Sequence, residues 1–369
     1  MDIEQRLAEP GWLILARQSR GLTQKELANS LSVTQGWLSR VESGLRGVPE
    51  DKLLQIARVL NYPLEFLTQS EPVYLRGLTS IFHRKRQGLS DKTMDKVYAQ
   101  LSITSTSLER LLESIDIVGK DIEQIDLAEF NGSIEDVARA VRDQFGIPRG
   151  PIQNVTRSLE NARAIVIPFD FNTRRIDAIS FWPFRSMPLF FVNLGSPGDR
   201  LRFTLCHELG HIVMHQSDIR EDIEGEANRF AAEFLMPGKQ IEPYLHDLSL
   251  SKLAALKIQW KVSMAALIRR SSSLNTITEG QAKYLWIQMG RNGYKQREPE
   301  ELDIPVEVPR LYREIIDTYQ NELQYNVPEL CKLLRLPEED VRRIFIDTPQ
   351  YELAQSLIEE AEQIIKENN

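Results

Sequence analysis

The chain has little cysteine: Cys206 and Cys331 are its two cysteines, and they lie far apart in the sequence. No disulfide framework is therefore implied, and a reducing cytoplasm fits best. No apolar run approaches the roughly 20 residues that a membrane-spanning helix needs. The N-terminal MDIEQRLAEPGW also lacks the basic-then-apolar layout of a signal peptide. We expect a cytoplasmic protein without a membrane partner.

A strong positive charge is absent as well. The net charge of -8 at pH 7 argues against non-specific coating of nucleic acid, although one small module can still bind DNA because its footprint is local. The hydrophobic fraction of 42% and the charged fraction of 27% are globular values, so we expect no long disordered segment. A length of 369 residues exceeds one ordinary domain and predicts two or three.

The N-terminal part has the pattern of a small helical domain. Within residues 9–68, apolar residues recur at helical spacing in four segments that precede the short PLEFL, which predicts five helices. Thr23 is a good N-cap for the second helix, and Glu26 completes a capping box three residues later. We expect residues 71–131 to be helical and largely amphipathic, as a linker and packing region.

The segment SVTQGWLSRVESG divides into a buried and an exposed face, as a helix that reads the major groove of DNA must. Leu38 and Val41 face inward, over apolar residues of the preceding helix. Gln35 could pair with adenine, and Arg40 with guanine or a phosphate. The residues that are left to face DNA are Thr34, Gln35, Gly36, Ser39 and Arg40.

The segments LTQKELA and LSRVESG resemble the Xre/Cro/phage-repressor helix-turn-helix family over about residues 9–68. The match is specific, because both helices and the closing E-x-G occur in register. Gly36 stands where a base-reading side chain is often found, so we expect fewer direct contacts to bases. The resemblance implies that the positions approaching DNA include Gln24, Gln35, Gly36 and Arg40.

The expected DNA partner is a short inverted-repeat operator in double-stranded DNA, bound by a homodimer, because a single helix reads only a few base pairs. The charge of the module keeps an alternative open. Residues 1–70 contain eight Lys and Arg and eight Asp and Glu, a balance that also suits a helical protein–protein module without DNA binding.

From about residue 134 the sequence pattern changes, because strand-like segments now follow helix-like ones. SIEDVARAVRDQFG predicts a helix that ends at Gly146, and ARAIVIPFD, RIDAISFW and PLFFVNL predict three strands. EGEANRFAAEFLM predicts a helix that Pro237-Gly238 stops, followed by three short helices in residues 249–290 and by helices throughout residues 308–369. The fold class is therefore α+β and mostly helical. The predicted domains are a helix-turn-helix domain at 1–70, the linker at 71–131, a zincin-like domain at 132–296 and a C-terminal helical region at 297–369.

The segment TLCHELGHIVMH, residues 204–215, contains three of the chain's five histidines. His207 and His211 project from one face of a helix, so both imidazoles can reach one ion at the roughly 2 Å that zinc prefers. Glu208 is placed to take a proton from metal-bound water, not to bind the metal. Gly210 costs roughly 1 kcal/mol in a helix interior, which suggests close approach by another backbone.

A catalytic zinc site also needs a third protein ligand. His215 follows four residues after the second histidine, but a helix rotates by about 40° over four residues, so a third ligand on an unbroken helix is strained. We therefore expect His215 to pack in the core or to support a ligand residue. Glu224 and Asn228 are four residues apart in the next helix, so one could ligate while the other orients a histidine. Glu226 is the rival ligand, and Glu233 is expected to be a solvated surface charge.

Three segments, GPIQNVTRSLENARAIVIPF, RLRFTLCHELGHIVMH and IEGEANRFAAEFLMP, resemble in order the ImmA/IrrE family of zinc metallopeptidases, over about residues 135–295. The resemblance implies a gluzincin-like zinc endopeptidase with Glu208 as the general base. It implies that the zinc ligands are His207, His211 and Glu224.

Members of this family are linked to cleavage of Xre-type repressors, and some are fused to an Xre module. The resemblance therefore implies a transcriptional regulator that cuts a repressor-like or toxin-like partner, or itself, in a stress, mobile-element or toxin–antitoxin-like circuit. In one alternative, the zincin fold is a sensor or dimer platform without turnover. In the other, the C-terminal helices recognise a partner such as a toxin and zinc is structural. An intact Glu208 favours catalysis, because a structural site does not need a base there.

The basic hinge LRGLTSIFHRKRQGLSDKT lies between the two halves. It could be an exposed cleavage loop or a patch that contacts phosphates. A solvated helix and loop is the simpler interpretation. Its basic residues are Arg76, Arg84, Lys85 and Arg86.

Overall fold

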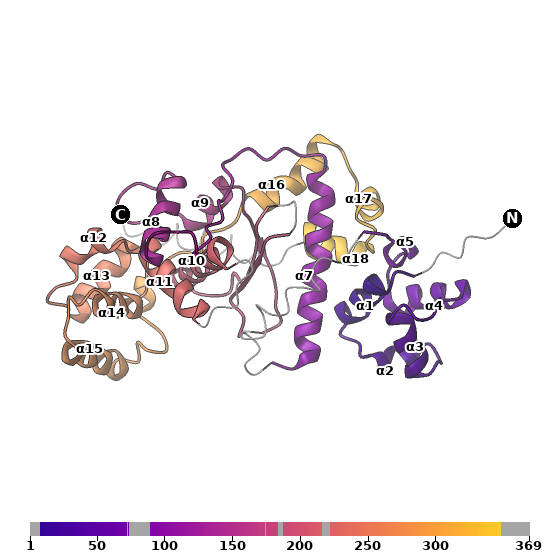
Figure 1. The fold of residues 1–369 in the computed structure, drawn as a ribbon, viewed down its shortest axis with the longest axis horizontal. Helices are drawn as coiled ribbons and strands as arrows, with labels where there is room; N and C mark the ends of the chain where they lie inside the picture. Colours follow the sequence, from indigo (N-terminus) through magenta and orange to yellow (C-terminus); the bar gives the residue numbers. More distant parts are fainter. Residues whose placement is uncertain are drawn as a thin grey trace. The chain divides into compact units, whose positions relative to one another are not determined.

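The chain divides into two compact units in a computed structural model (Figure 1). The first unit joins the chain up to Asp116 to the segment that begins at Arg313, and the second spans Ile117–Tyr312. The predicted domain boundaries after residues 70, 131 and 296 remain a prediction. The basic hinge residues lie outside the part of the chain that the structure describes, which is residues 8–71, 73, 89–173, 175–183, 187–215 and 222–347.

The first unit begins with the five predicted short helices, which are confirmed. The side chain of Thr23 accepts a hydrogen bond from Glu26 N, and Thr23 N donates to the Glu26 carboxylate, so the predicted capping box is present. Leu38 and Val41 are buried, as is Leu27 of the preceding helix, and the two helices pack together as the pattern predicts. The helices are α1 (Pro10–Ser19), α2 (Gln24–Ser30), α3 (Gln35–Glu42), α4 (Glu50–Leu60) and α5 (Leu64–Leu67).

Helix α7 (Asp91–Leu112) packs against α1 in the same unit. The helix predicted over residues 71–131 is therefore only partly right, because residues 115–131 are irregular. The apolar residues of this segment make separate contacts instead of forming one helix face. Ile122 lies in the core of the second unit, and Ile125 N donates a hydrogen bond to Val213 O at 2.9 Å. These contacts to a distant segment replace the bonds that a helix would make within itself.

The C-terminal helices complete the first unit. Tyr319 Oη donates to Leu111 O at 2.9 Å, and Arg110 donates to Leu334 O at 2.9 Å, so this segment packs on α7. Between α17 and α18, Arg335 takes the left-handed conformation (φ 55°) that a glycine would adopt more easily. The predicted helices of residues 308–369 are confirmed as far as residue 347, interrupted by turns. They are α16 (Leu311–Asp317), α17 (Val327–Leu334), α18 (Glu338–Val341) and two π-helical turns, Thr318–Glu322 and Arg342–Ile346.

An ion pair joins the two ends of the chain within this unit. Arg20 Nη2 lies 2.7 Å from Asp340 Oδ2, and the Asp340 side chain is 2% exposed. Burial alone would raise the pKa of the Asp340 carboxyl, but hydrogen bonds from Arg20 and Arg343 hold it below its ordinary value. This ion pair, whose carboxylate is buried, therefore holds the C-terminal helices against α1.

We expect Asp340→Ala to lower the free energy of unfolding by about 2–3 kcal/mol, because it leaves Arg20 without its partner. Urea denaturation followed by circular dichroism measures the change. The matched control is Glu338→Ala, which removes an exposed partner of Arg342 and should cost under about 0.5 kcal/mol. Because the pKa of Asp340 is lowered by folding, its stabilisation is present above pH ~4 and is lost as the pH falls further. Equal losses for both variants at pH 7 would contradict the prediction.

The second unit is built on a small sheet in which the three predicted strands are confirmed. β1 (Ile165–Pro168) pairs in parallel with β3 (Leu189–Val192), and β2 (Ala178–Phe181) pairs antiparallel with the other edge of β3. All residues of these strands are buried. The sheet is therefore covered on both faces.

Helix α10 (Gly198–Met214) lies on this sheet, and α11 (Ile223–Leu235) packs along α10. Around them lie α8 (Ile134–Gln144) and α9 (Val155–Asn161). The three short helices predicted after Pro237-Gly238 are confirmed, and follow the single turn α12 (Gly238–Ile241). They are α13 (Leu250–Trp260), α14 (Met264–Ser273) and α15 (Glu279–Arg291). The fold is thus α+β and mostly helical.

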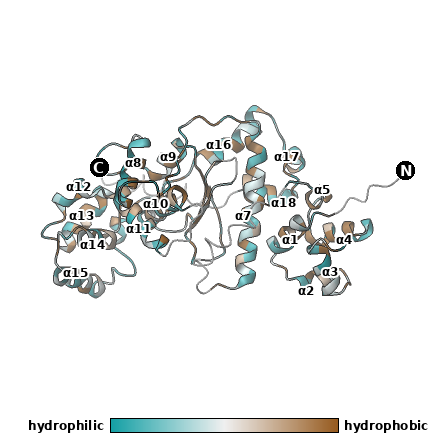
Figure 2. Ribbon diagram, viewed as in Figure 1, coloured by the Kyte–Doolittle hydropathy of each residue, from teal (hydrophilic) through white to brown (hydrophobic). Residues whose placement is uncertain are grey.

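The hydropathy of the helices is mixed. Polar residues recur along α7, which has 22 residues (Figure 2). Among the described residues, none of the helices combines the length and the apolar character that crossing a bilayer requires.

Candidate metal centre

The candidate site is built on α10 and α11, which pack against each other in the second unit. Gly210 allows this approach, because a Cβ at that position would lie 3.1–3.3 Å from the side chain of Phe230. The close neighbour of Gly210 is thus an aromatic side chain, not the backbone that we expected. Cys206 is fully buried on the inner side of α10, and burial raises the pKa of its thiol. That burial makes the thiol inert and leaves it a packing role.

Three side chains converge between the two helices. His207 Nε2 and His211 Nε2 are 3.1 Å apart, and the Glu224 carboxylate lies 3.4 Å from the first and 3.5 Å from the second. Ligand atoms about 2.0–2.2 Å from a tetrahedral zinc ion lie about 3.3–3.6 Å from each other. The three side chains therefore fit one four-coordinate ion.

The charges of the cluster agree with that fit. Hydrogen bonds with His207, and then with His211, hold the pKa of the Glu224 carboxyl well below its ordinary value. His207 and His211 are nearly buried, with side chains 12% and 8% exposed, whereas the Glu224 side chain is 43% exposed. The site thus opens on the Glu224 side.

A second layer of polar groups holds the two imidazoles. His207 Nδ1 lies 3.1 Å from Asn228 Oδ1. With Nε2 turned toward the ligand cluster, Nδ1–H donates to the amide oxygen of Asn228. This contact orients the ring of His207, and the role of Asn228 in supporting a ligand stays a prediction.

His211 is held by a longer chain of contacts. Its Nδ1 lies 3.0 Å from His215 Nδ1, and His215 Nε2 lies 2.8 Å from Glu226 Oε2. His215 is the C-cap of α10 and has left the helical conformation (φ −118°, ψ 64°), so it need not follow the rotation of the helix. Of the two acids that the sequence left open, Glu224 contacts the imidazole pair and Glu226 contacts His215.

Glu208 lies one residue after the first histidine and is buried. Ser180 of β2 donates to Glu208 Oε2 from its hydroxyl at 2.7 Å and from its backbone N–H at 3.1 Å. These two bonds fix the carboxylate against the edge of the sheet. Sequence reasoning missed Ser180, although a single polar residue inside the apolar run AISF was a signal.

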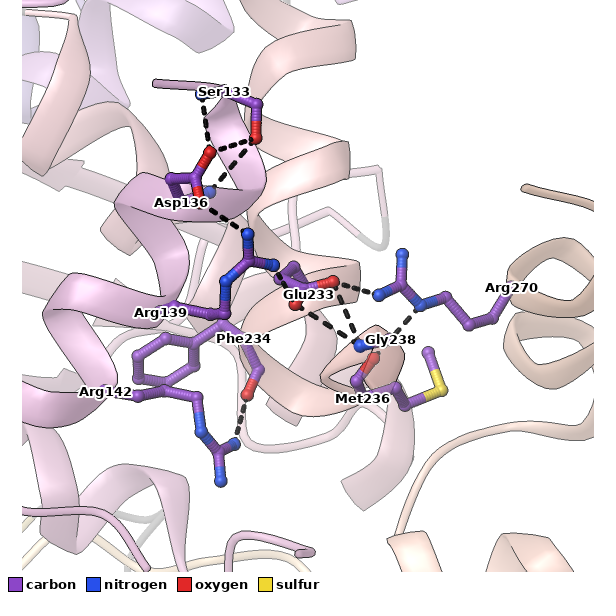
Figure 3. A network of polar contacts seen from close by, with 9 residues as sticks. All are labelled: Ser133, Asp136, Arg139, Arg142, Glu233, Phe234, Met236, Gly238 and Arg270. Carbon is purple, nitrogen blue, oxygen red and sulfur yellow. Dashed lines mark hydrogen bonds and ion pairs between the residues drawn. The ribbon is translucent and has the colours of Figure 1, made fainter. Parts of the chain in front are cut away.

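Glu233 is not the solvated surface charge that the sequence suggested. Its side chain is 3% exposed and accepts hydrogen bonds from Arg139, Arg270 and Gly238 N (Figure 3). Arg142, in the same view, donates to Phe234 O and to carbonyls beyond α8. A buried carboxylate needs such partners, and this one joins α8, α11 and α14.

The predicted DNA-facing surface lies on the first unit and is exposed. Thr34 also caps α3, since its hydroxyl accepts from Trp37 N at 3.1 Å. Gln24 donates to Glu42 at 2.8 Å, and Glu42 is paired with the buried Arg17 at 2.6 Å. Gln24 is thus oriented by a buried ion pair. The exposed residues are Thr34, Gln35, Gly36, Ser39 and Arg40.

Two family comparisons agree with these sites. Residues 161–272 match the IrrE N-terminal-like domain of a peptidase family. This segment contains the histidine pair, Glu208 and Glu224. Residues 13–67 match a helix-turn-helix family. A comparison with curated proteins gives no match.

The chain thus combines a helix-turn-helix domain of a DNA-binding type with an IrrE-like domain of a metallopeptidase type. The expected fusion of an Xre-type and an ImmA/IrrE-type domain is confirmed. The metallopeptidase family implies a metal ion, and the three convergent side chains are a suitable place for one.

Proposed function

We propose that the protein is a DNA-binding transcriptional regulator with a zinc-dependent endopeptidase domain. The observation that carries the proposal is the convergence of His207, His211 and Glu224, where Glu208 follows His207 in the sequence. Three protein ligands with an exposed side suit a catalytic metal, since a structural zinc site is usually closed by four. Zinc bound there would supply a Lewis acid that polarises a peptide carbonyl and activates water.

The residues of the chain would divide the remaining work. Asn228 holds His207, and His215 with Glu226 holds His211, so neither imidazole has to reorganise. Ser180 holds Glu208 in one orientation. In that orientation the Glu208 carboxylate takes a proton from the attacking water and passes it to the departing amide nitrogen.

We propose a repressor-like or toxin-like protein, or the chain itself, as the substrate, cut in an exposed loop in a stress, mobile-element or toxin–antitoxin-like circuit. The resemblance to repressor-cleaving peptidases supports this choice. The zinc-loaded protein is incubated with the regulators encoded beside it, and products are identified by mass spectrometry. One specific cut that a chelator prevents is the expected result; intact partners under every condition would favour a sensor or partner-binding platform without turnover.

The first unit is proposed to bind an operator in double-stranded DNA as a homodimer. Gln24, Thr34, Gln35, Gly36, Ser39 and Arg40 are the proposed contact residues. The five of these residues from Thr34 to Arg40 are exposed, and the half-buried Gln24 is oriented by its hydrogen bond to Glu42, which supports the assignment. Gly36 has no other atom within 4 Å of the place where a Cβ would stand, so α3 can approach the bases closely there.

Arg40→Ala should weaken binding to the operator by about 1–3 kcal/mol if the guanidinium contacts a base. Fluorescence anisotropy with operator and random duplexes measures the change. The control is Arg58→Ala, which removes an exposed arginine from α4. An equal loss on both duplexes would show that Arg40 contacts phosphate only, and no loss on either would remove it from the interface.

A further inference from the structure

A large cleft adjoins the candidate metal site within the second unit. Its volume is about 1160 Å³, and its walls include residues of α8, α10, α11, α12, α13 and α14 and of the segment after α15. Thr204 and Asn228 line the end nearest the site. Asn228 contacts His207, and Thr204 lies one turn before His207 on α10. The cleft is therefore joined to the candidate site through Asn228 and through the turn of α10 that precedes His207.

The lining of the cleft is cationic, although the chain as a whole is acidic. Among the described residues that line it, nine are Lys or Arg and five are Asp or Glu, whereas the net charge of the chain is -8. A cleft lined by one sign of charge focuses its field and attracts ligands of opposite charge.

The deep charges of the cleft are already neutralised. Glu233 is shared by Arg139 and Arg270 (Figure 3), and Lys257 is paired with Asp199 and Glu298. Each of these six side chains therefore already has a partner of opposite charge. They stabilise its walls and do not select a ligand.

Four cations differ from these pairs. They have no carboxylate partner within 4 Å in the described chain, and all four are exposed. Arg269 Cζ and Lys295 Nζ each lie 5.9 Å from the ring centroid of Trp286, so the positions of both side chains are partly fixed. The four are Arg229, Lys239, Arg269 and Lys295.

We propose that this cleft binds an acidic, partly apolar polypeptide segment of the substrate, whose carboxylates pair with these four cations. The inference rests on the proposed peptidase function and names its substrate class. Phe203, Met236 and Leu274 also line the cleft and would hold apolar side chains between the acidic ones.

The lining suits a polypeptide better than a single-stranded nucleic acid. Grooves for single strands present successive aromatic rings on which bases stack. Phe203 and Tyr294 are the aromatic residues among the described lining, and they come from different segments. A peptide entering the cleft would also bring its backbone to the end beside His207.

The test measures binding without turnover. The probe is a fluorescein-labelled peptide of alternating Glu and Leu, and the protein is the full zinc-loaded chain carrying Glu208→Gln. Adding Arg269→Glu and Lys295→Glu should weaken binding by about tenfold or more, because two attractions become repulsions. The matched control adds Lys283→Glu and Arg291→Glu, the same charge change at exposed positions of α15 outside the cleft lining.

Three results of the binding test would overturn the inference. Equal weakening by both pairs of reversals would mean that only net charge matters. Equal binding of the peptide with Gln in place of Glu would remove the role of the carboxylates. Tighter, cleft-dependent binding of an oligothymidine would assign the cleft to nucleic acid. If the protein cuts a partner specifically and the cleft reversals do not change that cleavage, the inference alone is overturned. If the peptide binds in a cleft-dependent way but the protein cuts no partner, only the proposed function is overturned.

Discussion

Replacement of Glu208 by Gln is expected to abolish proteolysis while leaving metal content and DNA binding intact. The substitution keeps the shape of the side chain and removes the proposed base, and general acid–base catalysis contributes about 10²–10⁴-fold to rate. Ser180 can still donate to the amide oxygen of the new side chain, so the packing against β2 is retained. The rate of partner cleavage, with zinc content measured on the same sample, checks the expectation.

Mixing wild-type and Glu208→Gln protein separates self-cleavage from cutting in trans. If the chain cuts in trans, wild-type protein cleaves the variant; if it cuts only itself, the variant stays intact. Ser180→Ala is the companion variant and should slow cleavage less, because it loosens the carboxylate without removing it. Identical derepression of the target promoter by wild-type and Glu208→Gln protein in cells would make catalysis dispensable and support the sensor alternative.

Replacement of Glu224 by Gln is expected to strip the metal, because it removes one of the three proposed protein ligands and the anionic one among them. Glu226→Gln should keep the metal at reduced affinity, by about 10–100-fold, since it loosens His215 and, through it, His211. Elemental analysis after dialysis, and competition with a zinc chelator, measure the two effects. Both variants keep side-chain volume, so differences in folding should not obscure the result.

Asp222→Asn is a useful control in the same helix. Asp222 caps α11 by accepting from Gly225 N at 3.1 Å and has no place in the ligand cluster. It should leave the metal affinity near the wild-type value. If the Glu226→Gln variant lost the metal and the Glu224→Gln variant kept it, Glu226 would be the ligand and Glu224 would be the acid that supports a histidine.

The sequence by itself determined the elements whose signals are local. The five N-terminal helices follow from the 3.6-residue spacing of apolar residues, and the Thr23–Glu26 capping box is confirmed because both partners lie within one turn. The spacing of His207 and His211 placed both rings on one helix face, as α10 shows. The three strands could be predicted in the same way, because each is a short run of β-branched and aromatic residues between residues that end strands.

The tertiary structure decided whatever depended on segments far apart in the chain. Glu224 and Glu226 carry the same carboxyl group two residues apart, and only the packing of α11 on α10 directs one to the imidazole pair and the other to His215. The burial of Glu233 required Arg139 and Arg270 from two other helices. A carboxylate is stable in a protein interior only where such partners form hydrogen bonds or ion pairs with it. The periodic pattern of one helix does not show which residues of other helices will pack against it.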